Sequence, residues 1–302
     1  MSTWQAEHSV DEAVVRQLLG QFPELAIESL IHLSEGWDRS AWLVNGKLVF
    51  GFPRRAVVVP GVEREITFLS RLAPLLPLPI PVPLYVGRPT DGYPWPFFGS
   101  AFVPGRESGE AELDDHSRTR VAVELAGFLR RLHSPAVAQA LAADSLPVDG
   151  NERAEMAARV PKTRASLVEL DRLGLWKETG KLAEILREAE GLPSSAATSV
   201  VHGDLHFRHV LVDRGHASGV IDWIDLCRGD PAIDLQVFWS FVPASGRRAF
   251  LGAYGPIRDD QLLRARVVAV SLSADLVLYG HAEQLATIKA EALDSLARAT
   301  TE

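Results

Sequence analysis

The sequence is short of the residues that stabilise or target a secreted or membrane protein. Cys227 is the only cysteine among 302 residues, which excludes an internal disulfide and agrees with a reducing cytoplasm. Residues 1–9 lack the basic and apolar regions of a signal peptide. The longest apolar run, 267–279, is interrupted by two serines and an aspartate and is too short to cross a bilayer. We therefore expect a cytoplasmic protein without a membrane partner.

Positive charge is also scarce. The chain has 31 Lys and Arg against 39 Asp and Glu, a formal net charge of -8, which argues against a nucleic-acid partner. An acidic surface suits a cationic small molecule, but it is equally ordinary in cytoplasmic proteins. The composition, with 47% hydrophobic and 23% charged residues, is that of a globular protein. The length suits one large domain or two lobes.

The most informative stretch contains two carboxylates, Asp204 and Asp222, separated by two apolar runs. The runs, 210–213 and 219–221, read as strands joined by a tight turn, so they pair antiparallel and their outer ends lie side by side. We expect the two carboxylates to approach each other. One can take a proton from a hydroxyl while the other holds Mg²⁺, and kinase-type phosphoryl transfer needs both roles.

The residues His202-Gly203-Asp204, followed by Ile221-Asp222-Trp223, resemble the catalytic loop and the metal aspartate of the aminoglycoside phosphotransferase family. That family has a kinase-like fold and includes antibiotic kinases for aminoglycosides and macrolides, together with small-metabolite kinases. The segment 229–235 is similar to the family's G-D-P-x-x-D-L. The chain departs at His209, where the family usually has Asn and its macrolide kinases accept His. The resemblance covers roughly 27–254.

The resemblance implies an α+β, bilobal, protein-kinase-like fold. Residues 1–103 would form a small β-rich N-lobe with one helix that covers the nucleotide, and residues 104–302 a larger, mainly helical C-lobe. The order of elements along the chain agrees, with a hinge at Pro104-Gly105. β-Like runs are 26–33, 40–44, 47–52, 82–87 and 97–103, and Asn45-Gly46 predicts a hairpin turn because both residues tolerate positive φ.

Helical periodicity begins at Val62 and continues through Ile66, Leu69 and Leu72. The proline-rich stretch 74–83 that follows is either a stiff entry into the next strand or a polyproline ligand. In the second lobe we expect helices at 114–133, 151–173, 175–190 and through most of 234–299, with strands between 199 and 223.

By resemblance, Asp204 is the catalytic base and Asp222 holds the metal. A carboxylate at the end of an apolar strand is costly unless it is paired or binds a cation, which agrees with the second role. His209 falls where the family supplies a second metal ligand. Its imidazole nitrogen suits Mn²⁺ or Zn²⁺ better than Mg²⁺. It either coordinates weakly, binds phosphate, or leaves one metal firmly held. We assign His202 an architectural role in the loop.

The N-lobe half of the site is less regular. In the family, the third strand carries a Lys or Arg that grips the phosphates and pairs with a helix glutamate. The helix glutamate is Glu65, but the basic position falls on Gly51. We place Arg54 at the phosphates, and Arg55 or Arg39 are alternatives, since Arg binds phosphate bidentately.

Two further contacts to the nucleotide follow from the resemblance. The segment 34–40 is the phosphate-covering loop, where Ser40 and backbone N–H groups contact phosphate. The base lies against the backbone of Ala101 to Val103. Helices after residue 234 form the acceptor pocket, in which Asp230, Asp234 and Asp275 are candidates to face a cation. Asp234 is equally readable as a helix-terminal structural residue.

The sequence therefore predicts an ATP- or GTP-dependent O-phosphotransferase that uses Mg²⁺, or Mn²⁺, and acts on a hydroxyl of an aminoglycoside- or macrolide-like antibiotic or a related metabolite. The alternative is a nucleotide- or metabolite-binding pseudoenzyme, suggested by Gly51 and His209. A metal hydrolase built on His202, Asp204, His206 and His209 is a third reading. The oligomeric state is not predictable.

Overall fold

The computed structural model describes residues 6–36, 38–142, 145–177 and 179–300 and divides the chain into two compact units. The first unit comprises Met1–Pro74, Pro79–Val103 and Asp222–Leu226, and the second comprises Leu75–Leu78, Pro104–Ile221 and Cys227–Glu302. The main division follows Val103. Two short segments do not follow this division. Leu75–Leu78 belongs to the second unit, and Asp222–Leu226 belongs to the first.

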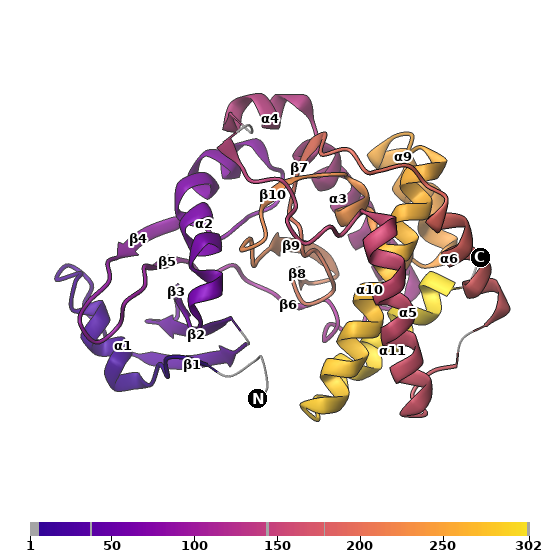
Figure 1. The fold of residues 1–302 in the computed structure, drawn as a ribbon. Helices are drawn as coiled ribbons and strands as arrows, with labels where there is room; N and C mark the ends of the chain where they lie inside the picture. Colours follow the sequence, from indigo (N-terminus) through magenta and orange to yellow (C-terminus); the bar gives the residue numbers. More distant parts are fainter. Residues whose placement is uncertain (1–5, 37, 143–144, 178, 301–302) are drawn as a thin grey trace. The chain divides into compact units, whose positions relative to one another are not determined.

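The first unit contains a five-stranded antiparallel sheet in the order β1-β2-β3-β5-β4 (Figure 1). Its strands are β1 (Leu30–Glu35), β2 (Arg39–Val44), β3 (Leu48–Pro53), β4 (Pro83–Gly87) and β5 (Phe97–Ala101). Asn45 and Gly46, with φ of 54° and 64°, form the turn between β2 and β3, which confirms the predicted hairpin. The first strand begins four residues later than predicted.

Helices α1 (Glu12–Leu19) and α2 (Val59–Leu72) cover opposite faces of this sheet. The core on the α1 side includes Leu18, Phe50 and Phe97, whereas Val62 of α2 packs with Phe98. Successive side chains of a strand point to opposite faces, so Phe97 and Phe98 separate the two cores. Helix α1 was not predicted.

The apolar stripe of α2 has the predicted helical spacing, but it includes a charged residue. Val62, Leu69 and Leu72 are fully buried, and Glu65 between them has an exposed fraction of 0%. A buried carboxylate is costly unless it is paired. Glu65 is therefore expected to have a cationic or hydrogen-bonding partner in the structure.

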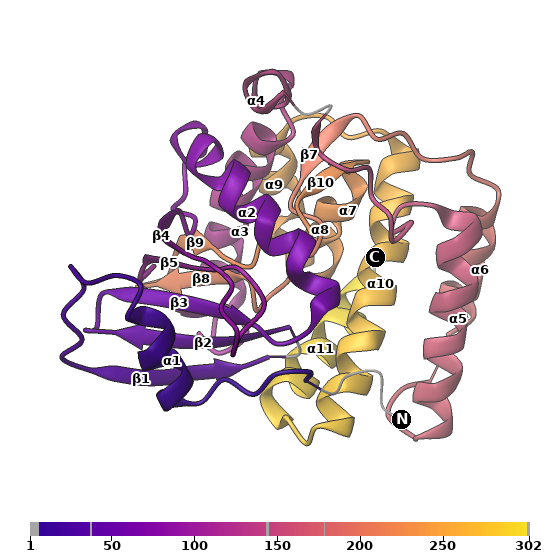
Figure 2. The same ribbon diagram turned by 60° about the vertical axis from the view of Figure 1, so that its left-hand side comes forward.

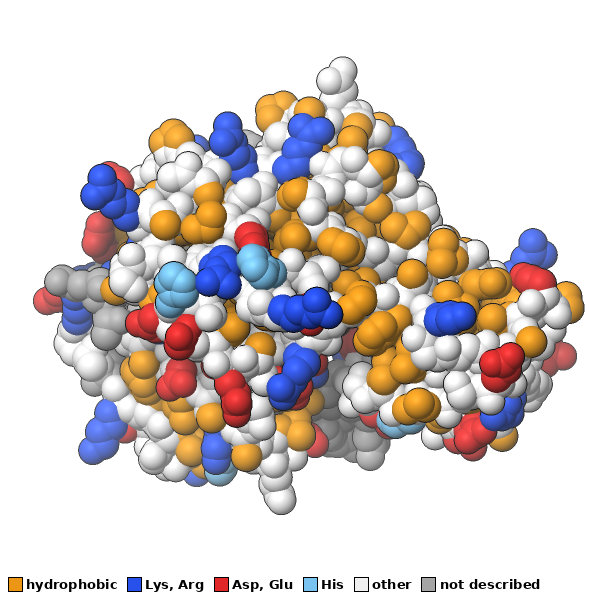
Figure 3. Space-filling view, turned by 180° about the vertical axis from the view of Figure 1, so that it is seen from behind, with side chains coloured by type: hydrophobic (Ala, Val, Ile, Leu, Met, Phe, Trp, Pro, Cys, Tyr) orange, Lys and Arg blue, Asp and Glu red, His pale blue; other side chains and the backbone are white. Residues whose placement is uncertain are grey.

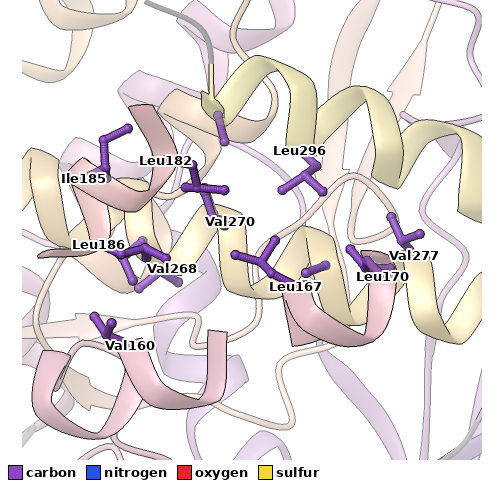
Figure 4. Close-up of a cluster of buried hydrophobic side chains, with 14 of the residues drawn as sticks. Val160, Leu167, Leu170, Leu182, Ile185, Leu186, Val268, Val270, Val277 and Leu296 are labelled. Carbon is purple, nitrogen blue, oxygen red and sulfur yellow. The ribbon is translucent and has the colours of Figure 1, made fainter. Parts of the chain in front are cut away.

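The second unit is mainly helical. It contains α3 (Asp115–Leu132), α4 (Pro135–Leu141), α5 (Met156–Arg172), α6 (Gly180–Glu190), α7 (Ala232–Leu235), α8 (Val237–Ser240), α9 (Arg247–Tyr254), α10 (Asp259–Ala282) and α11 (Ala286–Thr300). Figure 4 shows side chains of α5, α6, α10 and α11 that point toward one another, among them Leu167, Leu186, Val270 and Leu296. This interior forms one hydrophobic core of the second unit.

Two small sheets lie in the described part of the second unit (Figure 1 and Figure 2). Strand β7 (Ser199–Val201) pairs with β10 (Cys227–Gly229), and β8 (Val210–Asp213) lies between β6 (Arg106–Glu107) and β9 (His216–Val220). Strands β8 and β9 are antiparallel and are joined at Arg214 and Gly215, which have positive φ, so the predicted pair of strands is confirmed. The loop between β7 and β8 carries the His202-Gly203-Asp204 motif.

Acidic and basic side chains lie interspersed with apolar ones on the face of the molecule drawn in Figure 3. Across the part of the chain that the structure describes, no helix combines the length and the apolarity that crossing a bilayer requires.

Candidate active site

The loop between β7 and β8 presents Asp204, the predicted base. Gly203, with φ of 92°, turns the chain through a conformation that favours glycine. The side chain of Asp204 is 31% exposed, while His206 and His209 are buried beside it. The loop thus leaves one carboxylate accessible among buried imidazoles.

Asp234 of α7 anchors the backbone of this loop. Its Oδ2 accepts a hydrogen bond from the N–H of His202 at 2.8 Å, and its Oδ1 accepts one from Gly203 at 3.0 Å. His133 Nε2 donates to Oδ2 from 3.0 Å. Burial raises the pKa of Asp234, but the hydrogen bond from His133 and the nearby charges outweigh it, so the net pKa lies below its ordinary value. Asp234 is fully buried, so the prediction that it faces a cationic acceptor was wrong.

His202 holds the loop through both ring nitrogens. Its Nδ1 accepts a hydrogen bond from the backbone N–H of Asp204 at 3.2 Å, so its Nε2 carries the proton and donates to the carbonyl of Ile221 at 3.0 Å. The predicted architectural role of His202 is confirmed. Two more side chains bind loop carbonyls: Ser108 donates to Phe207 at 2.8 Å, and Gln236 donates to Leu205.

Asp204, His206 and His209 form a compact cluster, with one ligand atom of each within 4.8 Å of the others. His206 Nε2 lies 3.6 Å from Asp204 Oδ2, and the two imidazole rings are 4.0 Å apart. His209 Nδ1 donates to the carbonyl of Asp204 at 2.7 Å, so Nε2 is the nitrogen that His209 can offer to a metal or phosphate.

The pKa values of this cluster make Asp204 ionised and His206 neutral at neutral pH. Burial raises the pKa of Asp204, but the interactions with His206 and His209 lower it by more than burial raises it. The net pKa lies well below its ordinary value. Burial, followed by the charge of His209, lowers the pKa of His206 to about 4. At neutral pH, Asp204 is therefore a carboxylate able to accept a proton, and His206 is neutral.

The titration of His206 predicts a pH-dependent stability. Its pKa is about 4 in the folded protein against 6.5 ordinarily, so the unfolded chain binds the proton more tightly. The contribution of His206 to the free energy of unfolding is fully present above pH 6.5. About 3 kcal/mol of it is lost as the pH drops toward 4. Thermal unfolding of the nucleotide-free protein in chelator, at a series of pH values, measures this loss. His206→Asn should flatten the profile in this window, and an unchanged profile would show that His206 does not contribute.

Removing the anchor of the loop should lower the free energy of unfolding. In Asp234→Asn, an amide NH₂ replaces one oxygen and faces the N–H donors of His202 or Gly203. We expect a loss of about 2–4 kcal/mol in the free energy of unfolding, because buried donors lose their acceptor. Chemical denaturation measures it, with Asp259→Asn, an exposed aspartate at the start of α10, as control. Equal stability of the two variants would show that Asp234 is not the anchor.

The first unit contains a partly buried ion pair on the α2 side of its sheet. Arg39 of β2 donates from one terminal nitrogen to Glu65 Oε1 at 3.2 Å and from the other to Oε2. Its guanidinium carbon lies 5.5 Å from the centre of the Phe98 ring. Glu65 therefore has a cationic partner, although Gly51 removes the one that the family places on β3.

Glu65 also fixes the segment that follows β9. Its Oε1 accepts the N–H of Trp223 at 3.0 Å, and the Trp223 side chain is fully buried. Asp222, the predicted metal ligand, has a φ of 62°, a conformation that Asp and Asn adopt more readily than most residues. Burial lowers the pKa of Arg39, and the charge of Asp222 opposes that effect. Asp222 and Arg39 thus act on each other electrostatically within the first unit.

The other predicted phosphate contacts lie elsewhere in this unit. Arg54 donates to the carbonyl of Gly36 at 2.6 Å and pairs with Glu35, while Arg55 pairs with Asp38. Both arginines therefore bind residues between β1 and β2 or at the end of β1. The fully buried Ser40 accepts a hydrogen bond from Trp42 Nε1 at 2.9 Å on the core face of β2.

The nucleotide contacts proposed for Arg54 and Ser40 stay predictions that these placements do not support. Trp37 of the predicted phosphate-covering loop lies outside the described residues. Ala101 is the exposed last residue of β5, and Val103 is the last residue of the first unit before Pro104. Asp204 belongs to the second unit and Asp222 to the first, so their approach also stays a prediction.

A cavity of about 170 Å³ in the second unit is lined by four acids, Asp149, Glu152, Glu155 and Asp230. Three of them hold local structure: Asp149 pairs with Arg153, Glu155 accepts from Ser195, and Asp230 accepts from the N–H of Ala232. Asp275 accepts from Ser166 on the surface of α10. These acids therefore do not by themselves define an acceptor site.

Comparison with known proteins gives the family. A model of the phosphotransferase enzyme family, APH, matches residues 29–266. An aminoglycoside 3'-phosphotransferase from Escherichia coli is 26% identical over 209 residues, which are 64% of this chain and 69% of that protein. The solved GDP and kanamycin complex of APH(2")-IIia has a TM-score of 0.71 and 25% identity, covering 96% of this chain and 98% of its own. The apoenzyme of macrolide 2'-phosphotransferase MphH from Brachybacterium faecium has a TM-score of 0.61 and 22% identity over 94% and 97%.

The family match and the fold thus define a phosphotransferase with a protein-kinase-like α+β fold, an enzyme that uses an alcohol group as acceptor. The chain belongs to the APH phosphotransferase enzyme family. The family and the fold predicted from the sequence are confirmed.

Two contacts of the candidate site were not predicted from the sequence. Asp234 lies 32 positions from His202, and Arg39 lies 26 positions from Glu65, so both contacts are set by tertiary structure. A signal existed for each. Asp234 belongs to the recognised G-D-P-x-x-D-L segment, and Gly51 required that another cation replace the missing one.

Proposed function

We propose that this chain transfers the γ-phosphoryl group of ATP or GTP to a hydroxyl of an aminoglycoside- or macrolide-like antibiotic or a related metabolite. The observation that carries the proposal is the loop of Asp204, an ionised and partly exposed carboxylate on a backbone anchored by Asp234, His202, Ser108 and Gln236. The relatives are named for aminoglycosides and macrolides, and one was solved with GDP and kanamycin, which supports this acceptor class and a purine nucleotide.

In this reaction Asp204 accepts the proton of the acceptor hydroxyl and orients its oxygen toward the γ-phosphate. Positioning and charge neutralisation supply most of the acceleration in phosphoryl transfer. A carboxylate fixed in place by its loop gives the first of these without reorganisation at the moment of reaction. Its pKa lies below its ordinary value, so it is ionised at neutral pH.

Asp222 and His209 are the proposed metal ligands. The carboxylate oxygens of Asp222 fit Mg²⁺, which binds oxygen ligands together with phosphates. His209 offers Nε2, which fits Mn²⁺ better than Mg²⁺. When bound, the ion neutralises charge on the phosphate oxygens. Glu65 fixes the backbone beside Asp222 through Trp223, and Ala101 and Val103 are the proposed contacts to the base.

A pseudoenzyme of the same fold is the alternative, and Gly51 and His209 are the residues that favour it. Arg39 weakens the first argument because it gives Glu65 a cationic partner. The hydrolase reading loses one of its ligands, because both ring nitrogens of His202 bind backbone groups, those of Asp204 and Ile221.

A thermal-shift screen with ATP and GTP, with and without Mg²⁺ or Mn²⁺, across aminoglycosides, macrolides and simple amino alcohols tests the proposal. We expect stabilisation by nucleotide that requires the metal, and phosphorylation of at least one acceptor. A nucleotide shift with no acceptor phosphorylated favours the pseudoenzyme. No shift with either nucleotide contradicts the proposal.

A further inference from the structure

Gly51 creates a gap on the face of the sheet that faces α2. Ala41 of β2 lies opposite Gly51 of β3, and Arg39 lies opposite Pro53, so Arg39 is the diagonal neighbour of Gly51 on the same face. Diagonal pairs in a sheet are within reach of long side chains. An arginine on β2 can therefore extend over a glycine on β3.

The side chain of Arg39 occupies the space that Gly51 leaves. A Cβ placed on Gly51 would lie 3.4 Å from Cδ of Arg39 and 3.7 Å from one of its terminal nitrogens. Any longer side chain at position 51 would have to share this space with the arginine. The missing side chain on β3 thus leaves room for the long cationic side chain on β2.

The guanidinium of Arg39 is linked through Glu65 to the segment that carries the proposed metal ligand. Glu65 orients it through two hydrogen bonds, and the same carboxylate fixes Trp223, next to the proposed metal ligand Asp222. The side chain of Arg39 is 18% exposed. Its Nε–H is buried and has no hydrogen-bond partner among the residues that the structure describes. A buried donor without an acceptor is costly, and a phosphate oxygen is an acceptor that would satisfy it.

We propose that Arg39 is the phosphate-binding cation of this enzyme and that it supplies from β2 the charge that the family carries on β3. The inference rests on the proposed function, because it assumes that a nucleotide is the ligand. It assigns Gly51 a role as well: the missing side chain makes room for Arg39. Arg54, the residue that the sequence favoured, is instead engaged with the turn between β1 and β2.

The test moves the charge from one strand to the other. Arg39→Gln removes the cation, and Arg39→Ala/Gly51→Lys returns one from β3. Affinities for the Mg²⁺ complexes of ADP and GDP, and for adenosine and guanosine, are measured by calorimetry. We expect Arg39→Gln to weaken the preferred diphosphate about 10- to 100-fold, the effect of one charged hydrogen-bonding group, and to leave the nucleoside unchanged. The double variant should recover at least about tenfold of the loss.

Two controls separate a phosphate contact from a structural effect. Arg88→Gln removes an exposed arginine of the same unit and should change neither affinity. Arg54→Gln tests the rival arginine, and a selective loss of diphosphate affinity in this variant alone would overturn the proposal. If Arg39→Gln unfolds because Glu65 is left unpaired, the double variant decides, since its lysine can pair with Glu65. A folded double variant that binds nucleoside but has lost the diphosphate also overturns the proposal.

The wild-type measurement separates this inference from the proposed function. A wild-type protein that binds neither diphosphate contradicts both. A wild-type protein that binds a diphosphate, together with an Arg39→Gln variant of affinity within about twofold of it, contradicts only the role of Arg39.

Discussion

Asp204→Asn is expected to lower kcat for phosphate transfer by about 10²- to 10⁴-fold, the contribution of a positioned general base. The amide keeps the shape of the carboxylate and cannot take the proton of the acceptor hydroxyl. Because Asp204 acts on the acceptor, the affinity for nucleotide should change little. Initial rates and nucleotide titrations on the same preparation measure the two quantities.

Asp213→Asn is the matched control for this variant. Asp213 is an exposed carboxylate at the end of β8, in the same unit as Asp204, and its loss should leave kcat unchanged. The role of Asp204 as base is contradicted if the two variants have equal kcat. A drop in nucleotide affinity as large as the drop in kcat would contradict it as well.

Asp222→Asn is expected to act on the other half of the reaction. Removing one charged ligand should weaken binding of the metal–nucleotide complex by about 10-fold or more, since even indirect support of a metal ligand contributes about 10- to 100-fold. Asn is the suitable replacement because it tolerates the positive φ of Asp222. Calorimetric titration with ATP or GTP at several Mg²⁺ concentrations measures the effect.

Asp225→Asn is the control, because it removes the same charge three positions further along the chain within the first unit. We expect its metal dependence to match that of the wild type. The division of roles between the two aspartates fails if Asp204→Asn and Asp222→Asn lose nucleotide affinity to the same extent.

The sequence predicted the elements whose signals are local. Asn45-Gly46 defines the β2–β3 hairpin because both residues accept positive φ. The spacing of Val62, Leu69 and Leu72 defines α2 because one face of a helix repeats every three or four residues. In both cases a few neighbouring residues carry the information.

Helix α1 was missed because its stability comes from packing and not from its own length. It has eight residues, begins at the N-cap Asp11, and buries Val15, Leu18 and Leu19 against the sheet. Isolated helices of this length are not stable in water. Whether such a segment becomes a helix is therefore decided by a surface formed elsewhere in the chain.

The candidate site shows the same division between local and long-range information. Asp204 and Asp222 could be proposed as site residues because each belongs to a contiguous motif. The partners of the motif were not, since Asp234 holds His202 from a later helix and Arg39 reaches Glu65 from another strand. Residue type and position in the sequence do not specify such pairs, whereas a fold that brings buried charges together does.

The central claim is that the chain moves a phosphoryl group from a nucleoside triphosphate to an alcohol with Asp204 as base. The most direct measurement is mass spectrometry of an aminoglycoside and a macrolide after incubation with ATP or GTP, Mg²⁺ and either wild-type protein or Asp204→Asn. We predict the mass gain of one phosphoryl group on an acceptor with the wild type and a rate about 10²- to 10⁴-fold lower with the variant. Equal phosphorylation by both proteins would contradict the account.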